Sequence, residues 1–578
     1  MTRPFQLPLW LRRYDRRCLS QDIMAGLVAG IIVIPQSLGY AALAGLPPVY
    51  GLYSAIVPVL VYAWIGASNV NAVGPVAVTA IMTAHALQNY QHLPPEQYAL
   101  SAGFLALLMG ALLWLASLFR LGWITRFISQ GVTAGFVTGA SILIFISQIK
   151  FLIGINLSGG TIIDYALAFT NRIHTLHLPT LMVGALAFGL FFINRYYLNR
   201  WLAHWLARKT AQFIVRQLPL IIMIAAVAFS LLLDFQHRGI AVVEHVPAKL
   251  PHFVLPFSGG LHDVSNQVIQ LLPTAALIAL ITFVSSNSVA ASCARKRQEA
   301  FDTNQELKGL GWANIIGAFF QSFPVVGGFS RTAVNADAGA QTPLAGIISV
   351  GVMVAFLLLL TDYLKPLPYA VLAANIMVAI ISMMDWDTLK RAARSDKTDA
   401  AAFLTACFGV LLFGLNIGLV LGILVSFAGL IWQSSHPHLT IVGQTADGHF
   451  RSIKRYATTQ YSSLLIVRID ESMFYGNAQP IRYYLERTLV AQPDCKHLIL
   501  MLSAVNNIDL TAQEMLFSLN HDLQKQQISL HFADIKGPLA DKLQHSVMIK
   551  SLSGNVFVST AEAVNTLLKE ESVWSPMI

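Results

Sequence analysis

Charge is scarce in this chain. Of its 578 residues only 12% are charged, whereas 55% are hydrophobic, and the mean hydropathy is +0.60. A soluble domain carries nearer to 25% charge, so a wholly soluble protein is excluded and most of the chain is expected in a lipid bilayer. The net charge of +9 does not indicate a nucleic-acid partner, because the basic residues lie in short loops between apolar runs. That pattern is typical of membrane topology, with Lys and Arg kept on the cytoplasmic side.

Cysteines are few, and catalytic motifs are missing. The sequence has no GxxxxGK phosphate loop, no HExxH pair, and no visible triad or paired carboxylates. Nucleotide hydrolysis through a phosphate loop and HExxH zinc chemistry are therefore excluded. The four cysteines are far apart, and we interpret them as reduced and structural; they are Cys18, Cys293, Cys407 and Cys495. We expect no enzyme activity, no cofactor and no metal site.

Hydropathy predicts fourteen apolar segments, several of them shorter than the roughly 20 residues that a straight span needs. Their approximate bounds are 22–40, 48–66, 74–88, 97–118, 128–153, 179–198, 213–233, 271–292, 306–321, 329–338, 342–361, 366–384, 399–414 and 416–432. With a cytoplasmic N-terminus and fourteen crossings, the most basic connections all fall on the cytoplasmic side. Those connections contain residues 120–126, 195–216, 295–297 and 390–397.

Two of the short segments occupy matching places in the two halves of the chain. Segment three follows Gly74 and Pro75, and segment ten follows Gly327 and Gly328. Each is third in its set of seven. Short segments interrupted by Gly or Pro at corresponding positions indicate an inverted repeat with the binding site between them.

Arg331 stands at the start of segment ten, where the hydropathy predicts lipid depth. An arginine at the bilayer centre costs about 2.5–3.5 kcal/mol on insertion scales, so its presence there favours anion binding. Two helix N-termini facing each other would add partial positive charge and free N–H groups. Hydroxyl donors for an anion are expected from Thr79, Ser330 and Thr332. The structural alternative is a kinked helix whose arginine reaches the membrane surface or pairs with Asp337.

Two further polar positions lie within apolar segments. Gln36 follows Pro35 in segment one. Either it lines the substrate pocket, or Pro35 only kinks the helix and a neighbouring helix satisfies the amide of Gln36. Segment eight contains Ser285, Ser286 and Asn287 but no carboxylate. Serines at membrane depth are often packing residues that bond to backbone carbonyls, and both interpretations stay open for this cluster.

After about residue 440 the composition becomes polar, and strands alternate with helices. Residues 463–469, 496–502 and 528–533 are predicted to form buried strands, and residues 511–524 and 560–568 amphipathic helices. Asp509 and Ser559 are predicted as N-terminal caps. This region is therefore a soluble α/β domain of about 130 residues, which the topology puts in the cytoplasm.

Several motifs, in order, resemble those of the SulP anion transporters. They are IPQSLGYA from Ile34, AGLPPVYGLY from Ala44, VGPVAV from Val73, DTNQEL from Asp302 and FSRTAVN from Phe329. The C-terminal region resembles the STAS domain of that family. The resemblance covers nearly the whole chain.

The resemblance implies a polytopic α-helical membrane protein with a fourteen-segment, seven-plus-seven inverted repeat and a cytoplasmic STAS domain. Segments 1–4 and 8–11 would form a core, and segments 5–7 and 12–14 a gate. It also implies a homodimer, movement of core against gate like an elevator, and a small anion bound between segments three and ten. The substrate-binding positions implied are Gln36, Val76, Ala77, Val78, Phe329, Ser330 and Arg331.

The chain departs from the family pattern at Ser285. Many bacterial members have a carboxylate there, which is thought to handle a coupling proton or sodium ion. Asp337 is the remaining carboxylate expected near the path, but it lies about 9 Å along the helix from Arg331. We therefore expect flux that a proton or sodium gradient drives only weakly. In the STAS region, Leu510 stands where related proteins carry a phosphorylated serine.

The sequence thus predicts an anion transporter of a bacterial inner membrane, with sulfate or bicarbonate as first candidates and dicarboxylate or chloride as others. The alternatives are an uncoupled anion channel and a membrane-anchored STAS binding or scaffold protein. Expected partners are the anion, the lipid bilayer, a second copy of the chain and a cytoplasmic protein bound by the STAS domain, but no nucleic acid. The domains expected are a cytoplasmic N-terminal segment (1–21), a transport domain (22–432), a linker (433–439), a STAS domain (440–570) and a C-terminal tail (571–578).

Overall fold

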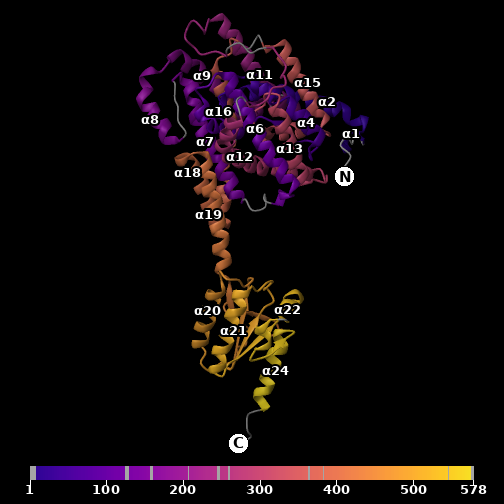
Figure 1. The fold of residues 1–578 in the computed structure, drawn as a ribbon, viewed down its shortest axis with the longest axis vertical. Coiled ribbons are helices and arrows are strands. Elements are labelled where there is room, and N and C mark those ends of the chain that lie inside the picture. The colour runs from indigo at the N-terminus through magenta and orange to yellow at the C-terminus, as the bar shows by residue number, and fades with distance from the viewer. Residues whose placement is uncertain are drawn as a thin grey trace. The chain divides into compact units, whose positions relative to one another are not determined.

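The structure is a computed structural model, drawn in Figure 1. It describes residues 8–12, 14–123, 129–155, 161–202, 204–205, 207–243, 248–257, 261–361, 365–381, 383–544 and 546–573. Within these ranges some side chains lie outside the description, including those of Phe329, Ser330 and Asp337. The chain divides into two compact units, residues 1–426 and 427–578.

The helices of the first unit follow the predicted apolar segments in order, beginning after the short helix α1 (Leu9–Arg12). Seven helices in the described part are long and apolar enough to cross a membrane. The helices that correspond to the fourteen segments are α2 (Leu19–Leu43), α3 with α4 (Val49–Tyr53, Val57–Ile65), α5 (Ala77–Ala86), α6 (Pro95–Leu118), α7 (Gln130–Ile153), α9 (Leu178–Ile193), α11 (Arg208–Leu232), α12 (Leu261–Lys296), α13 (Thr303–Ala318), α14 (Phe329–Asp337), α15 (Leu344–Leu359), α16 (Tyr369–Ile381), α18 (Lys397–Phe413) and α19 (Leu415–Ser435).

Two surface helices were not predicted. Helix α8 (Ile162–Arg172) follows segment five and helix α17 (Trp386–Ser395) follows segment twelve, so each stands at the same place in its half. Both are amphipathic, with polar and apolar residues on different helix faces, and hydropathy averaged over the length of a membrane span does not detect that pattern. Their matching places are a further sign of the repeat. The short helix α10 (Asn199–Leu202) lies in a basic connection.

The packing of the helices repeats between the two halves. Helix α6, the fourth segment, packs against α12 and α13, while its counterpart α15 packs against α2 and α4. Likewise α7 packs against α18, and its counterpart α16 packs against α9. This exchange of partners is what an inverted repeat requires. We call α2–α6 with α12–α15 the core bundle, and α7–α11 with α16–α19 the gate bundle.

Local signals fix several helix ends. The hydroxyl of Ser129 accepts from the N–H of Val132 at the start of α7, and Gly154 ends that helix at φ 72°. Asp302 accepts from the N–H of Asn304 at the start of α13. These are the hydroxyl and carboxylate caps, and the left-handed glycine, that satisfy exposed backbone groups at helix termini.

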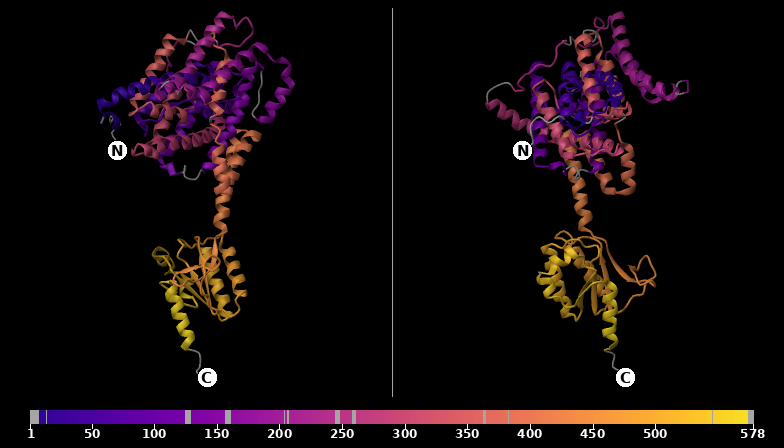
Figure 2. Two further views of the ribbon diagram at one scale, coloured as in Figure 1. Left: turned by 180° about the vertical axis from the view of Figure 1, so that it is seen from behind. Right: turned by 90° about the vertical axis from the view of Figure 1, so that its right-hand side faces the viewer.

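The second unit is built on a six-stranded sheet in the order β4-β3-β5-β6-β7-β8. Strand β3 is antiparallel to β4 and β5, and β5 to β8 are parallel. The strands appear in orange to yellow in Figures 1 and 2. They are β3 (Leu439–Gln444), β4 (Phe450–Ser452), β5 (Leu464–Ile469), β6 (His497–Met501), β7 (Ser529–Ala533) and β8 (Val556–Phe557).

Helices cover both faces of this sheet. One buried cluster joins the sheet to α20 and α21 with the short α22 and α23, and a second cluster joins it to α24. The predicted strands and helices of this region are confirmed, as are the caps at Asp509 and Ser559. The helices are α20 (Ala478–Val490), α21 (Leu510–Lys525), α22 (Gly537–Gln544), α23 (Val547–Lys550) and α24 (Thr560–Val573).

Candidate anion-binding site

Helices α5 and α14 meet with their N-termini at a short antiparallel ladder. Strand β1 (Val73–Gly74) pairs with β2 (Val326–Gly327), with Val73 opposite Gly327 and Gly74 opposite Val326. The N–H of Gly328 adds a further hydrogen bond, 3.2 Å to the carbonyl of Ala72. The ladder holds together two segments that lie some 250 residues apart in sequence, one from each half of the repeat.

Each half-helix begins with backbone N–H groups that its own turn does not use. The first intrahelical bonds are those from Ala80 to Val76 in α5, at 3.0 Å, and from Thr332 to Gly328 in α14, at 2.9 Å. The N–H groups before them belong to residues 77–79 and 329–331, since a helix leaves its first donors without partners. These two sets include five of the predicted substrate positions, namely Ala77, Val78, Phe329, Ser330 and Arg331, and the partial positive charges of both helices add there. The N–H of Val76, which was also predicted, instead donates to Oγ1 of Thr79 at 3.4 Å.

Arg331 is buried at the start of α14. Its side chain is only 4% exposed, and Nη2 has no hydrogen-bond partner in the part of the chain that the structure describes. A Cβ at Gly74 would collide with Nη1, so glycine at that position makes room for the guanidinium. A buried donor of a cation that lacks a hydrogen-bond partner is unfavourable, and an anion in contact with Nη2 would remove that cost.

Helix α2 packs against both half-helices. Gln36 is half-buried on α2, and its Oε1 is buried without a hydrogen-bond partner among the described residues. One turn later on the same face, the phenol of Tyr40 lies close enough to Arg331 for the two groups to interact electrostatically. The helix runs through Pro35 without ending. Gln36 therefore lies on the face of α2 that is turned toward the half-helices.

The hydroxyl donors expected from Thr79 and Thr332 are engaged within the protein. Thr79 donates to the carbonyl of Val76 at 3.0 Å, and Thr332 donates to Oδ1 of Asn71 at 2.9 Å. Oγ1 of Thr332 also accepts from the N–H of Ala72 at 3.0 Å. These two threonines hold the half-helices in place rather than point at a ligand. The side chains of Phe329 and Ser330, and that of Asp337, lie outside the described residues.

A buried carboxylate that the sequence interpretation missed lies directly behind the ladder. Glu306 of α13 is fully buried and accepts hydrogen bonds from Tyr62 (2.6 Å), Asn71 (2.9 Å) and Ser286 (3.2 Å). The sequence interpretation had considered Asp337 as the carboxylate near the path and did not consider Glu306. The sequence did carry a signal for this residue, because a glutamate begins the apolar segment nine. Hydropathy alone could not show that its side chain turns into the protein.

The polar cluster of segment eight has two different roles. Thr282 donates to the carbonyl of Ile278, one turn earlier, as packing residues in membrane helices do. Ser286 instead contacts Glu306 and receives a hydrogen bond from Asn71 at 3.0 Å. Ser285, the predicted coupling position, is half-buried beside it. The residue next to the predicted position thus joins the buried network.

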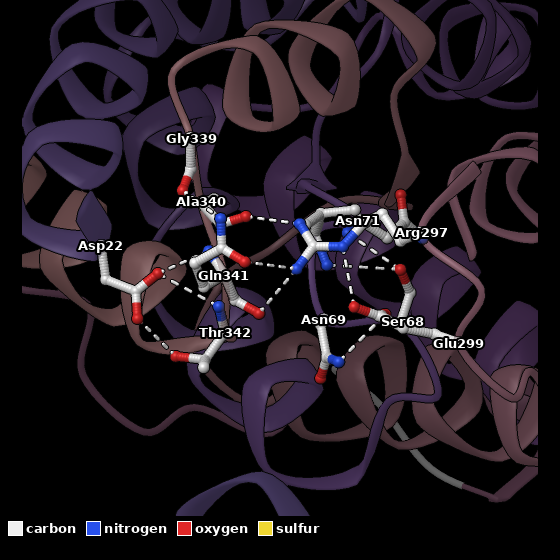
Figure 3. A network of polar contacts seen from close by, with 11 residues as sticks. Asp22, Ser68, Asn69, Asn71, Arg297, Glu299, Gly339, Ala340, Gln341 and Thr342 are labelled. Atoms are coloured by element: carbon white, nitrogen blue, oxygen red, sulfur yellow. Dashed lines mark hydrogen bonds and ion pairs between the residues drawn. The ribbon is translucent and has the colours of Figure 1, made fainter. Parts of the chain in front are cut away.

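A second network fixes the core bundle at the ends of α2, α12 and α14 (Figure 3). The carboxylate of Asp22 accepts from the N–H of Gln341 and the hydroxyl of Thr342, each at 2.7 Å. Arg297 bonds to Glu299 at 2.7 Å and to Oε1 of Gln341 at 3.0 Å. These contacts tie the start of the first segment to the connections on either side of segments nine and ten.

A cavity of about 40 Å³ lies between α2, α4, α14 and α15. Its lining includes Arg331 and Asn335 of α14 and Tyr62 of α4. It also includes Asn71, which lies in the connection between α4 and β1. The cavity thus touches both the buried arginine and two of the residues that hold Glu306.

Facing half-helices with a buried arginine, inside an inverted repeat of membrane helices, define a multi-pass membrane transporter. The model of the sulfate permease family matches residues 19–406, and that of the STAS domain matches residues 455–566. The chain belongs to the sulfate permease family and carries a STAS domain. Members of this family are permeases, so the chain is a transporter and not an enzyme.

The curated relatives are similar along most of their length. The chloroplastic sulfate transporter 4.1 of Arabidopsis thaliana is 32% identical over 97% of this chain and 82% of its own. The probable sulfate transporter MT1781 of Mycobacterium tuberculosis is 28% identical over 96% of both chains. High affinity sulfate transporter 2 of Stylosanthes hamata is 29% identical over 97% of this chain and 86% of its own.

Solved structures share the fold. The murine anion transporter Slc26a9 in the inward-facing state superposes with a TM-score of 0.87 at 22% identity, covering 98% of this chain and 96% of that one. The transmembrane domain of the cyanobacterial bicarbonate transporter BicA superposes with a TM-score of 0.61 at 20% identity, covering 70% and 98%.

Proposed function

We propose that the chain moves a small anion across a bacterial inner membrane, binding it between the N-termini of α5 and α14. The observation that carries the proposal is Arg331, a buried guanidinium whose Nη2 has no hydrogen-bond partner among the described residues. Around it lie the backbone donors of residues 77–79 and 329–331. Two helix N-termini and one guanidinium together offset much of the desolvation of a small anion, whereas each helix end contributes only about 1–2 kcal/mol.

The substrates we propose first are sulfate and bicarbonate, with a dicarboxylate and chloride as further candidates. Several relatives are named sulfate transporters, and one solved relative is named a bicarbonate transporter. Oxyanions of similar size make the same demands on N–H groups and one guanidinium, so geometry alone does not rank them. The substrate positions proposed are Gln36, Val76, Ala77, Val78, Phe329, Ser330 and Arg331.

The transport mechanism we propose is alternating access by an elevator-like movement of the core bundle against the gate bundle, in a homodimer. Support comes from the networks around Asp22 and Glu306, which bind the segments of the core bundle to one another and favour its movement as one body. The termini and the STAS domain are proposed to be cytoplasmic, because the basic connections fall on that side. A cytoplasmic protein is the proposed STAS partner.

The test is uptake of labelled sulfate, bicarbonate, succinate and chloride by proteoliposomes, with wild type and Arg331→Ala. We expect the variant to fold and insert but to lose at least tenfold in uptake of the preferred anion. Arg394→Ala, which removes an exposed arginine of α17, is the matched control. Undiminished uptake by Arg331→Ala would refute the site.

The same measurements separate the two alternative functions. Anion currents faster than the turnover of a transporter would favour the uncoupled channel, and the absence of a carboxylate at position 285 supports that alternative. No anion flux in wild type would favour the membrane-anchored STAS scaffold.

A further inference from the structure

Glu306 is a buried acidic group in the first turn of α13 for which the proposed transport site has no use. Its carboxylate is fully buried, and its partners within the described residues are neutral donors. Those donors are the hydroxyl of Tyr62 to Oε2, the amide of Asn71 and hydroxyl of Ser286 to Oε1, and the backbone N–H of Ala67. No cation pairs with Glu306 in the described ranges. A buried carboxylate without a countercharge is costly, and in membrane proteins such groups mark ion or proton pathways.

The carboxylate is connected to the anion site by two consecutive hydrogen bonds. Nδ2 of Asn71 donates to Glu306 at 2.9 Å, and Oδ1 of the same amide accepts from Thr332 at 2.9 Å. Thr332 follows Arg331 in the first turn of α14. Gly327 closes the other side, because a Cβ there would collide with Asn71 and Ser286. The amide of Asn71 therefore links Glu306 to the start of α14. A charge bound at the half-helix starts and the charge of Glu306 influence each other through it.

Water has a place to reach this group. The cavity beside Arg331 is lined by Tyr62 and Asn71, and its volume of about 40 Å³ exceeds the 10–15 Å³ that one water molecule needs. The residues that line it include Asn335, whose buried Oδ1 has no hydrogen-bond partner among the described residues. Tyr62 therefore both lines the cavity and, through its hydroxyl, donates to Oε2 of Glu306.

We propose that Glu306 is the proton-binding site of the transporter, loaded from this cavity through Tyr62 when the anion binds. The proposal rests on the proposed function and adds a coupling group on segment nine. A hydronium ion in the cavity gives a proton to the Tyr62 oxygen while the Tyr62 proton passes to Oε2. Tyr62 is left unchanged, and Glu306 becomes neutral. Release follows the same steps in reverse.

Anion and proton binding then favour each other. An anion beside Arg331 brings negative charge near the ionised carboxylate, and like charges disfavour the charged form. By linkage, protonation raises the affinity for the anion by the same factor as the anion raises the affinity for the proton. Weak coupling of anion flux to a proton gradient was expected because position 285 is a serine. Glu306 supplies a carboxylate at another position.

The surroundings contain few competing titratable groups. From α4 the group that faces Glu306 is Tyr62; from α12 and from the connection before β1 the facing groups are the uncharged Ser286 and Asn71. Arg297 and Glu299, bonded to each other, meet that connection at Asn69. A pH dependence of anion binding that disappears on neutralising Glu306 therefore identifies this carboxylate.

The first experiment uses the wild-type chain. Calorimetric titration with sulfate, succinate and chloride, in buffers with different ionisation enthalpies between pH 5.5 and 8, counts the protons taken up with each anion. We expect close to one proton per anion in part of this range. Anion binding with no proton uptake at any pH overturns this inference alone, whereas no binding of any anion overturns the proposed function.

The second experiment assigns the proton to a residue. Glu306→Gln keeps the size of the side chain and removes the charge, and Glu96→Gln, at an exposed position in the first turn of α6, is the matched control. In proteoliposomes with an inward proton gradient we expect Glu306→Gln to lose at least tenfold in gradient-driven accumulation while it still exchanges labelled for unlabelled anion. Retained gradient-driven accumulation overturns the proposal. If Glu306→Gln does not fold, Tyr62→Phe replaces it, and an unchanged pH profile of proton uptake in that variant overturns the relay.

Discussion

The guanidinium of Arg331 occupies the space that a side chain at Gly74 would need. A Cβ at Gly74 would lie 3.2 Å from Cζ of Arg331 and nearer still to Nη1, and the backbone there has φ +151°. L side chains rarely adopt that conformation. Glycine is therefore required for two reasons, the space that Arg331 needs and the backbone conformation. The two residues come from opposite halves of the repeat, so the site exists only when both halves are folded against each other.

Gly74→Ala is therefore expected to weaken sulfate binding at least tenfold, because the methyl group displaces the guanidinium and strains the backbone. The measurement is sulfate affinity by calorimetry on purified protein. Gly351→Ala is the control, since nothing lies within 4 Å of a Cβ at that position of α15. Equal losses in both variants would contradict a specific role for Gly74.

Thr332→Val is expected to lower stability and anion affinity together. Valine keeps the shape but leaves the N–H of Ala72 and Oδ1 of Asn71 without their partner. An unsatisfied buried polar group costs about 1–3 kcal/mol. Thr332→Ser retains the hydroxyl and should behave like wild type in thermal unfolding and sulfate binding. If valine and serine variants were alike, the link between the half-helices would not depend on this hydroxyl.

Asp22→Asn tests the network of Figure 3. Asp22 is fully buried and accepts from two N–H groups and one hydroxyl of Gln341 and Thr342. Loss of the charge weakens these bonds by about 1–3 kcal/mol in total. We expect a lower unfolding temperature and faster hydrogen exchange in residues 339–343. Asp387→Asn, at an exposed site on α17, should change neither.

The STAS unit is expected to lose stability as the pH falls from 6.5 toward 4. Burial, with a smaller contribution from His497, lowers the pKa of His531 to about 4. Between these values the unfolded chain binds more protons than the folded one, so stability is complete above pH 6.5 and declines below it. Because one pKa unit corresponds to about 1.4 kcal/mol, the loss on reaching pH 4 is about 3 kcal/mol.

Pulse proteolysis of the full chain in urea, followed at residues 427–578, measures this loss. His531→Asn should flatten the pH dependence, whereas His521→Asn, an exposed replacement on α21, should retain it. A pH dependence that His531→Asn leaves intact would assign the effect to another group.

The sequence by itself determined the order of the membrane segments, the inverted repeat and the α/β fold of the C-terminal unit. These features depend on hydropathy, on Gly and Pro at helix starts and on strand periodicity, all of which are local. The sequence also singled out Arg331 and the two half-helix starts, because a charge among apolar residues is visible without coordinates.

Only the tertiary structure decided which polar side chains face one another. Glu306, Asn71, Ser286 and Tyr62 come from three helices and a connection, and no sequence spacing relates them. The same holds for Thr79 and Thr332, which were expected to face a ligand and instead bond within the protein. Whether a buried carboxylate meets a hydroxyl, an amide or a cation depends on helix rotation and packing. Those are settled by long-range contacts, and they decide where a proton can bind.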